Sequence, residues 1–230
     1  GRPAGGLADR FRGILSVFYL CQELGLEFRL LFNHPFNLCN YLVPNNYNWE
    51  RDVHKVRYDI PKENILILDV TEDSHYQKQK QKKWLFQQLK KRNGQIHVYT
   101  NANFSYELNY HSLFHCLFKP SENLQAAIEH QKKKIGGPYI SISCRFLDLL
   151  EDFNETYGVR EKLSKKEKNA LLSTIKIQIE KLHKKHLNYK VLCNSDSITF
   201  LNYISDLGYT YVIPGTITHI DKSIDETDYI

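Results

Sequence analysis

Short apolar runs that alternate with helical stretches constrain the fold of this chain more than any other feature. Two such runs, NILILDV (64–70) and GQIHVYT (94–100), flank a helical stretch at 78–92. Their length and their β-branched content favour buried strands. A helix between two strands is typical of a crossover that joins parallel neighbours. We therefore expect an α/β protein with parallel sheets.

The same alternation continues along the whole chain, without an internal repeat of fixed period. We predict helices over 14–24, 109–118, 121–134, 161–187 and 198–207, and further strands over 26–32, 139–144, 189–193 and 209–215. Gly25 is expected to end the first helix, and Ser121 to cap a later one. The Gly-Gly-Pro at 136–138 is the strongest break, so we expect one domain over 1–134 and a second over 135–230.

The bulk composition narrows the class of protein. The longest apolar run, Ile14–Cys21, is broken by Ser16 and is too short to span a bilayer. The net charge of +5 suits a phosphate-bearing small molecule, an acidic membrane surface or RNA. The five cysteines include no CxxC pair, which favours reduced thiols in a cytoplasmic protein over a disulfide framework. The histidines lack the spacing of zinc ligands, so no metal site is expected.

The stretch at 78–92 carries seven basic residues and no acid, with Trp84, Leu85 and Leu89 among its lysines. It suits peripheral contact with an anionic membrane, but a solvated helix that docks through its apolar patch is favoured. The basic stretches at 78–92 and 161–187 also raise nucleic-acid binding as an alternative. That alternative is disfavoured, because the aromatic residues fall mostly within apolar segments, and we expect no nucleic-acid partner.

The opening sequence GGLADRFRGI places two glycines in front of a helix. Gly5 and Gly6 let backbone N–H groups approach an anion, which the amino end of a helix also attracts. Arg10 and Arg12 add positive charge where the helix dipole is already positive, so something negative is expected there. A tight turn capped by Asp9, with exposed arginines, is an equally weighted alternative.

Polar residues follow one of the strands expected in the second domain. Arg145 comes directly after YISISC, and in open α/β sheets ligands bind beyond the carboxyl ends of the strands. A guanidinium can grip a diphosphate with two parallel hydrogen bonds. Asp148, Glu151 and Asp152 come next, either as salt-bridge partners or as a general base beside the cation. From these residues alone, the salt-bridge interpretation is favoured.

The sequence Asn-Ser-Asp-Ser follows the next strand along the chain, at 194–197. Asp196 or Ser197 can cap the helix that begins after it, and capping is the commoner explanation. Alternatively, the Asp196 carboxylate accepts hydrogen bonds from a guanine edge or a ribose diol.

Taken in order, GGLADRFRGI, YISISCRF, and VLCNSDSITFLNYI followed by YVIPGTITHID resemble the GDP-fucose-dependent fucosyltransferases. The nearest group is the bacterial one allied to the nodulation, core α-1,6- and protein O-fucosyltransferases. The resemblance implies a GT-B-like fold of two Rossmann-like halves and metal-independent transfer that inverts the anomeric carbon. The domain at 1–134 would then be the acceptor side, and the domain at 135–230 the nucleotide-sugar side. We expect this second half to be incomplete, because the family's last serine-rich motif has no counterpart.

The resemblance also implies roles for residues of this sequence. The loop that faces the donor diphosphate and the acceptor would comprise Gly5, Gly6, Asp9, Arg10 and Arg12. The donor site would comprise Arg145 on the β-phosphate, Asp196 on guanine, and the neighbours Ser195 and Ser197. The proton acceptor is expected among Asp152, Glu151 and Asp9.

Three positions depart from the pattern of the family. The family's histidine falls on Ser143, which we keep in the donor site, and its second arginine falls on Phe146. The aspartate that follows the arginines is displaced to Asp148. These departures leave open an inactive, fucosyltransferase-like binding domain.

We therefore predict a bacterial glycosyltransferase that moves fucose from GDP-fucose to a hydroxyl of a surface glycan or lipid-linked glycan. The nucleotide sugar is its donor substrate, and neither a cofactor nor a metal is expected. Another GDP-linked sugar suits the same residues. A basic nucleic-acid-binding protein is the least favoured alternative.

Overall fold

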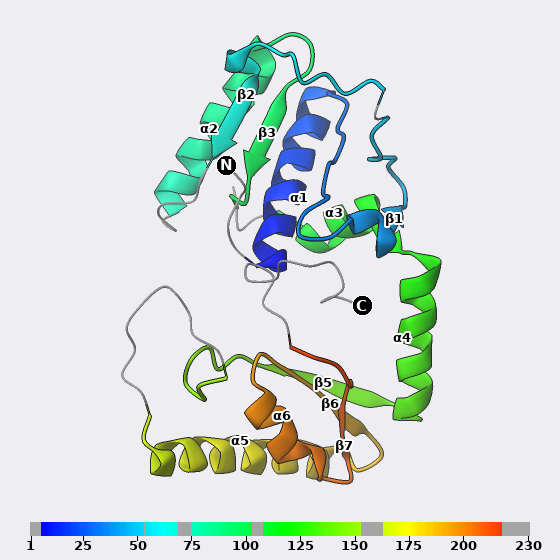
Figure 1. Ribbon diagram of the computed structural model, residues 1–230, viewed down its shortest axis with the longest axis vertical. Helices are drawn as coiled ribbons and strands as arrows, with labels where there is room; N and C mark the ends of the chain where they lie inside the picture. The colour runs from blue at the N-terminus through cyan, green and yellow to red at the C-terminus, as the bar shows by residue number, and fades with distance from the viewer. Residues whose placement is uncertain (1–5, 53, 69–74, 103–107, 153–162, 218–230) are drawn as a thin grey trace. The chain divides into compact units, whose positions relative to one another are not determined.

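The computed structural model describes residues 6–52, 54–68, 75–102, 108–152 and 163–217 (Figure 1). The chain divides into two compact units, which are described separately. Unit 1 covers the described residues up to Leu124, and unit 2 covers Gln125–Ile217.

Unit 1 combines helices with two small sheets. Its elements are α1 (Leu7–Leu24), η1 (Leu38–Asn40), β1 (Leu42–Pro44), η2 (Lys62–Asn64), β2 (Ile65–Leu68), α2 (His75–Lys91), β3 (His97–Thr100), α3 (Tyr110–Leu117), β4 (Phe118–Pro120) and the start of α4 (Glu122–Ile135). The predicted helices at 14–24, 78–92, 109–118 and 121–134 all have counterparts here. Ser121 Oγ accepts a hydrogen bond from the Leu124 amide at 3.3 Å, as expected of a cap.

Helix α1 begins after Gly6 and ends at Gly25, as the sequence predicts. Gly25 has a φ of 64°, and its amide donates to the carbonyls of Cys21 and Gln22. Gly13 lies against the end of β3, where a Cβ atom would come within 2.5 Å of the Thr100 carbonyl oxygen. Because that neighbour is backbone, only glycine permits this close packing of helix on strand.

Strands β2 and β3 pair in parallel, with Ile65 opposite His97 and Leu68 opposite Thr100. Both strands and their direction are confirmed. Burial on both faces, expected for the run at 64–70, is wrong. Leu66 and Leu68 are buried, whereas Ile65 and Ile67 are exposed. Within the described residues, this strand is therefore half-buried and alternates as one-sided strands do.

The strand predicted over 26–32 is absent from the structure. Leu30 makes only an isolated bridge with Glu50, so no strand partner runs alongside this segment. A side chain takes the partner's place at Phe28, since Tyr47 Oη accepts from the Phe28 amide at 2.7 Å and donates to the Phe28 carbonyl at 3.1 Å.

A short antiparallel pair, β1 and β4, was not predicted. Leu42 lies opposite Pro120 and Pro44 opposite Phe118, so helix α3 passes directly into a strand at Phe118. Strands of three residues are too short to carry a periodic signal. The chain is therefore α/β with parallel sheets, to which unit 1 adds one small antiparallel pair.

Aromatic packing fills the core of unit 1. Phe18 and Trp49 are almost fully buried, and Phe18 packs on Phe28 with ring centroids 5.3 Å apart. Trp49 packs on Phe118 at 5.3 Å, and its indole N–H donates to the Leu117 carbonyl at 2.8 Å. Each large apolar side chain buried in this way contributes roughly 1.5–3 kcal/mol.

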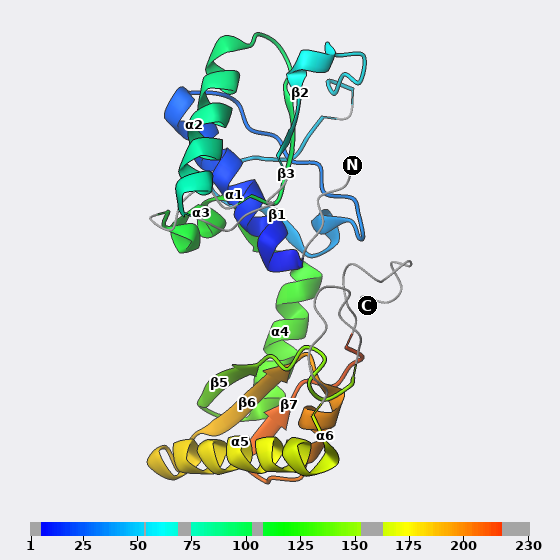
Figure 2. The ribbon, with the colours of Figure 1, turned by 90° about the vertical axis from the view of Figure 1, so that its left-hand side faces the viewer.

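Unit 2 contains a single three-stranded parallel sheet in the order β5-β6-β7 (Figure 2). Its elements are the rest of α4, β5 (Tyr139–Cys144), α5 (Lys165–Lys185), β6 (Lys190–Ser195), α6 (Ile198–Ser205) and β7 (Thr210–Val212). All three strands and both later helices were predicted. Helices α5 and α6 pack against β6, and Val191, Phe200 and Ile204 are fully buried between them.

A capping box that the sequence analysis overlooked begins helix α5. Ser164 Oγ accepts from the Glu167 amide, and the Glu167 carboxylate accepts from the Ser164 amide at 2.7 Å. The Ser-x-x-Glu spacing could have revealed it. The domain boundary expected between 134 and 135 stays a prediction.

Candidate functional site

The parallel register of β5 and β6 brings two candidate residues to one edge of the sheet. Cys144 lies opposite Ser195, so Arg145 and Asp196 both occupy the next position beyond their strands. Arg145 Nε lies 3.9 Å from Asp196 Oδ2, and the Arg145 side chain is 72% exposed. The structure thus places a cation and a carboxylate side by side where ligands of such sheets bind.

The Asp196 carboxylate also shapes the loop that follows β5. Its Oδ1 accepts from the Phe146 amide at 2.7 Å, and its Oδ2 accepts from the Leu147 amide at 3.0 Å. Leu147 has a φ of 57°, a left-handed conformation that a leucine rarely adopts without such support. Asp196 therefore fixes the conformation of the loop. Its Oδ1 also accepts a long hydrogen bond from Ser195 Oγ at 3.5 Å, and its Oδ2 lies against Arg145.

Asp152 joins the far end of this loop to the start of α6. Its carboxylate accepts hydrogen bonds from Ser197 Oγ, from the Thr199 amide at 3.2 Å and from Thr199 Oγ1 at 2.7 Å. Ser197 in turn caps α6, because its Oγ accepts from the Phe200 amide at 3.0 Å. Capping, the favoured interpretation of Ser197, is confirmed. These contacts give Asp152 a structural role at the helix start.

The carboxylates of Glu151 and Asp148 differ in their interaction partners. Glu151 pairs with Lys168, with Oε2 and Nζ 2.6 Å apart, and its φ is 63°. Asp148 Oδ1 is buried and has no hydrogen-bond partner among the described residues. A buried carboxylate oxygen without a partner is costly. Asp148, named from the sequence as a salt-bridge partner or a general base, therefore has no salt bridge to this oxygen among the described residues.

The positions that depart from the family pattern have ordinary structural surroundings. Phe146 is 3% exposed and packs on Phe200, with ring centroids 4.9 Å apart. It therefore belongs to the core of unit 2 and cannot carry the ligand contact of an arginine. Ser143 lies opposite Asn194 and is exposed on the outer side of β5.

Two cysteines lie in the strands that lead to Arg145 and Asp196, Cys144 at the end of β5 and Cys193 within β6. Burial raises the pKa of the Cys193 thiol to about 12, with a smaller contribution from Cys144. Burial, and secondarily the Asp196 carboxylate, raises the pKa of the Cys144 thiol. Both thiols therefore stay protonated near neutral pH and are poor nucleophiles. All five cysteines are free, as expected.

The opening loop belongs to unit 1, and the structure separates its two arginines. Arg10 is buried and donates to the His34 carbonyl at 3.4 Å. Arg12 is half-exposed and pairs with Asp9 at 3.2 Å. Residues two apart lie on nearly opposite sides of a helix, so the two guanidinium groups do not form one cationic surface. Gly5 lies outside the described residues.

The conformation of Gly6 is not one that requires glycine. Its φ of −63° is open to other residues, and among the described residues an added Cβ would approach Asp9 alone, at 3.9 Å. Asp9 does not cap α1, since Gly6 occupies the N-cap position without a side-chain hydrogen bond. The fold therefore gives no reason for a glycine at this position.

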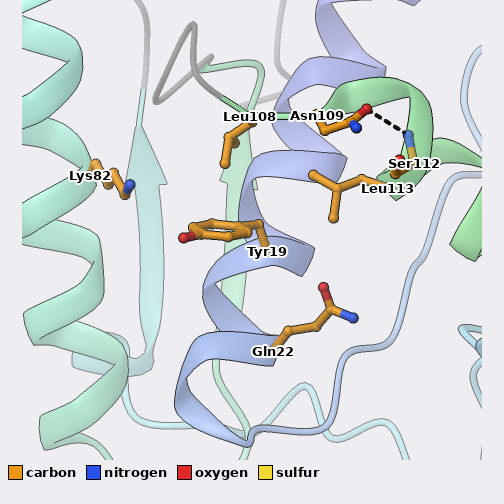
Figure 3. A pocket seen from close by; sticks show the side chains of 7 residues that line it. All are labelled: Tyr19, Gln22, Lys82, Leu108, Asn109, Ser112 and Leu113. Atoms are coloured by element: carbon orange, nitrogen blue, oxygen red, sulfur yellow. Dashed lines mark hydrogen bonds between the residues drawn. The ribbon is translucent and has the colours of Figure 1, made fainter.

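A pocket of about 440 Å³ lies in unit 1 where α1, α2 and the start of α3 meet (Figure 3). It is lined by Tyr19, Gln22, Lys82, Leu108, Asn109, Ser112 and Leu113. Lys82 Nζ lies 5.2 Å from the centre of the Tyr19 ring, and the lining residues that the structure describes include no carboxylate. An aromatic ring beside amide, hydroxyl and ammonium groups suits a small polar ligand. The sequence analysis singled out none of these residues.

No group of three or more His, Cys, Asp or Glu side chains lies close enough together to hold a metal ion in the described ranges. None of the helices in the described part of the chain combines the length and apolarity needed to cross a bilayer.

Sequence comparison identifies no relative of the chain, because neither a family model nor a curated protein matches it. Structural comparison does. The chain resembles the fucosyltransferase NodZ from Bradyrhizobium with a TM-score of 0.57 and 15% identity, over 93% of this chain and 76% of that one. Structures of the NodZ α-1,6-fucosyltransferase soaked with GDP-fucose or co-crystallised with GDP match it at 13% and 14% identity, with a TM-score of 0.57 each. The match with this chain covers 76% and 77% of the length of these two NodZ chains. Over most of its length, the chain therefore has the fold of the fucosyltransferase NodZ.

Proposed function

We propose that the chain is a glycosyltransferase that binds a GDP-sugar, GDP-fucose in the first instance, at the carboxyl edge of the β5-β6-β7 sheet. The observation that carries the proposal is the juxtaposition of Arg145 and Asp196 on two paired strand ends, 3.9 Å apart. The fold shared with NodZ, which has been crystallised with GDP and soaked with GDP-fucose, supports the same assignment.

Arg145 is the group we assign to the diphosphate. Its side chain is 72% exposed, and its contact with Asp196 is long for an ion pair. A guanidinium with this exposure at the edge of the sheet is accessible to a ligand from solvent. A charge-assisted hydrogen bond to a phosphate contributes roughly 1.5–3 kcal/mol, more than an exposed ion pair offers.

Asp196 is the group we assign to the base, with Ser195 beside it and Ser143 exposed on the neighbouring strand. Ser197 was expected in the donor site as well, but it is fully buried and its hydroxyl caps α6. Two lone pairs of its carboxylate already bind the loop amides, which fixes the plane of the carboxylate. Ser195 Oγ donates a long hydrogen bond to Oδ1 at 3.5 Å, and the two adjacent N–H donors of a guanine edge would take its place on the carboxylate. A carboxylate held in this way is pre-organised and loses little freedom on binding.

The reaction proposed is an inverting transfer without a metal. The bond between the anomeric carbon and the β-phosphate oxygen breaks while an acceptor hydroxyl attacks from the opposite face. The bonding electrons leave with GDP, where Arg145 stabilises the growing negative charge. The acceptor proton passes to a carboxylate, for which Asp9 and Glu151 remain better candidates than Asp152 with its three hydrogen bonds.

For the opening loop of unit 1, taken by itself, the proposal keeps the role that the resemblance implies, which is binding of phosphate and of the acceptor. Gly6 suits this role, because a glycine at the amino end of α1 lets backbone N–H groups approach an anion. Of the two arginines in this loop, Arg12 is the better candidate for a phosphate contact, because Arg10 is buried and donates to the His34 carbonyl. The acceptor would be a glycan or lipid-linked glycan.

Isothermal titration of the chain with GDP tests the donor site. We expect binding, and an affinity at least tenfold weaker in Arg145→Ala, which corresponds to about 1.4 kcal/mol. Arg57→Ala is the matched control, because Arg57 is similarly exposed and also contacts a carboxylate, Asp59 at 3.2 Å. Absence of GDP binding to the wild-type protein, or equal affinities in both variants, would overturn the assignment.

A binding domain without turnover is the second candidate function. Phe146 favours it, because this core residue stands where the resemblance places a second arginine on the donor. GDP binding without release of GDP from GDP-fucose, across a panel of glycan acceptors, would support this alternative over the transferase.

A further inference from the structure

We propose that the solvent-facing side of α2 is a docking surface for an anionic lipid bilayer. This basic–aromatic face consists of Tyr76, Lys80, Lys83, Trp84, Gln87, Lys90 and Lys91, all of them exposed. The inference concerns unit 1 alone and does not depend on the activity proposed for unit 2.

Helical geometry gathers these residues on one side. At 3.6 residues per turn they span about a third of the helix circumference. Lys78, Leu85 and Leu89 lie on the opposite side and are 4%, 0% and 4% exposed. The sequence predicts that Trp84, Leu85 and Leu89 form one apolar patch that docks this helix, but these residues lie on two different sides of the helix. The two leucines pack into the core, and Trp84 faces outward.

The charge on this face is uncompensated within the helix. Helix α2 contains no acidic residue, and none of Lys80, Lys83, Lys90 and Lys91 makes an ion pair in the described structure. The other lysine-rich helix, α5, differs. There Lys176 lies 4.0 Å from Glu180, and Lys168 pairs with Glu151. A patch of one sign of charge is complementary to a surface of anionic headgroups.

The exposed aromatic side chains distinguish a bilayer from other anionic partners. Tyr76 is 73% exposed and Trp84 is 40% exposed. Amphipathic rings of this kind suit the headgroup level of a membrane, where lysines can extend their ammonium groups toward phosphates. Eight residues of helix separate the two rings by about 12 Å, so they do not form a platform on which successive nucleic-acid bases could stack.

Tryptophan fluorescence gives a direct readout of docking. The chain has two tryptophans, and Trp49 is buried at 1% exposure, so a change on binding reports Trp84. We expect a blue shift with vesicles of phosphatidylcholine containing about one-third phosphatidylglycerol. We expect no shift with phosphatidylcholine alone, and loss of binding as salt rises well above about 0.1 M.

A matched pair of charge variants tests the location. Each lysine near an anionic surface strengthens binding about fivefold, so replacing Lys80, Lys83, Lys90 and Lys91 by Gln should raise the half-saturating lipid concentration at least about a hundredfold. The control replaces Lys165, Lys166, Lys184 and Lys185 of α5 by Gln, an equal change in charge on an exposed helix without Trp or Tyr. It should weaken vesicle co-sedimentation severalfold at most.

Three results would overturn the proposal. They are equal weakening in the two quadruple variants, equal binding to neutral and anionic vesicles, and tighter binding to oligouridine than to anionic vesicles. In Trp84→Phe the fluorescence change should disappear while co-sedimentation persists. Folding of each variant is checked by far-UV circular dichroism and thermal unfolding. GDP titration stays a separate measurement, so either proposal can fail alone.

Discussion

Unit 1 and unit 2 are held together in different ways. In its described residues unit 1 has two-stranded sheets alone, and its centre is a cluster of aromatic rings packed around α1. Unit 2 has one continuous parallel sheet, and carboxylates tie together the loop and helix beyond its strands. Non-directional packing maintains the first unit, whereas directional hydrogen bonds maintain the edge of the second.

This difference predicts which substitutions should lower the stability of each unit. An aromatic core is disturbed by changes in volume, since interiors are close-packed. A loop held by carboxylates is disturbed by changes in hydrogen bonding that leave volume nearly unchanged.

The change Gly13→Ala should destabilise unit 1 by about 3 kcal/mol. The new Cβ would lie 2.5 Å from the Thr100 carbonyl oxygen and 2.8 Å from Asn101 Cα, so backbone must move. Urea unfolding followed by tryptophan fluorescence reports this unit, which contains Trp49 and Trp84. Gly137→Ala is the control, because its Cβ would meet nothing within 4 Å. A loss below about 1 kcal/mol would show that helix and strand can separate freely.

The change Asp196→Ala should destabilise unit 2 by about 2 kcal/mol, because the amides of Phe146 and Leu147 lose their acceptor. Pulsed thiol labelling of Cys193 across a urea series measures this, since Cys193 is buried in the sheet. Asp206→Ala, an exposed carboxylate in the same unit, should change little. If both variants unfold at the same urea concentration, hydrogen bonding to the loop is not what maintains unit 2.

The change Ser197→Ala should cost unit 2 about 1 kcal/mol. It removes the cap on the Phe200 amide and the hydroxyl donor to Asp152. Cys193 labelling gives the free energy, with Ser205→Ala near the end of the same helix as control. Because Asp152 still accepts from Thr199, the effect should stay below that of Asp196→Ala. A larger loss of stability in Ser197→Ala than in Asp196→Ala would show that Asp152, and not Asp196, contributes most to holding the loop.

Raising the pH to 9.5 should cost unit 1 about 0.8 kcal/mol through Cys21. Burial raises the pKa of its thiol from 9.0 to about 11. The unfolded chain therefore loses the proton first, and stability falls as the pH rises from 9 toward 11. The difference in fluorescence-detected stability between pH 7.5 and 9.5 should shrink in Cys21→Ala. It should persist in Cys193→Ala, the same change in the other unit.

Elements with their own local signal were predictable from the sequence. Gly25 ends α1 as expected, and the three strands of unit 2 follow their β-branched runs. The segment at 26–32 failed because a strand requires a neighbour, and the hydroxyl of Tyr47 supplies the hydrogen bonds of Phe28 instead. Partners nineteen residues apart leave no local pattern to read.

The candidate site was predictable in outline and not in detail. Position after a strand was enough to place Arg145 near Asp196, because parallel register aligns strand ends. It could not reveal that Asp196 and Asp152 also hold the loop, since those bonds depend on how the chain turns after Cys144. Nor could it separate Arg10 from Arg12, because burial of Arg10 depends on the distant His34.

The hydrogen bonds that the Asp196 carboxylate accepts from two backbone amides couple ligand binding to the rigidity of the loop after β5. Any ligand donor that draws on this carboxylate competes with, or reinforces, the amides of Phe146 and Leu147. Selection for tighter ligand capture would then alter local rigidity at the same time, and directed evolution here should yield variants whose affinity and heat tolerance change together.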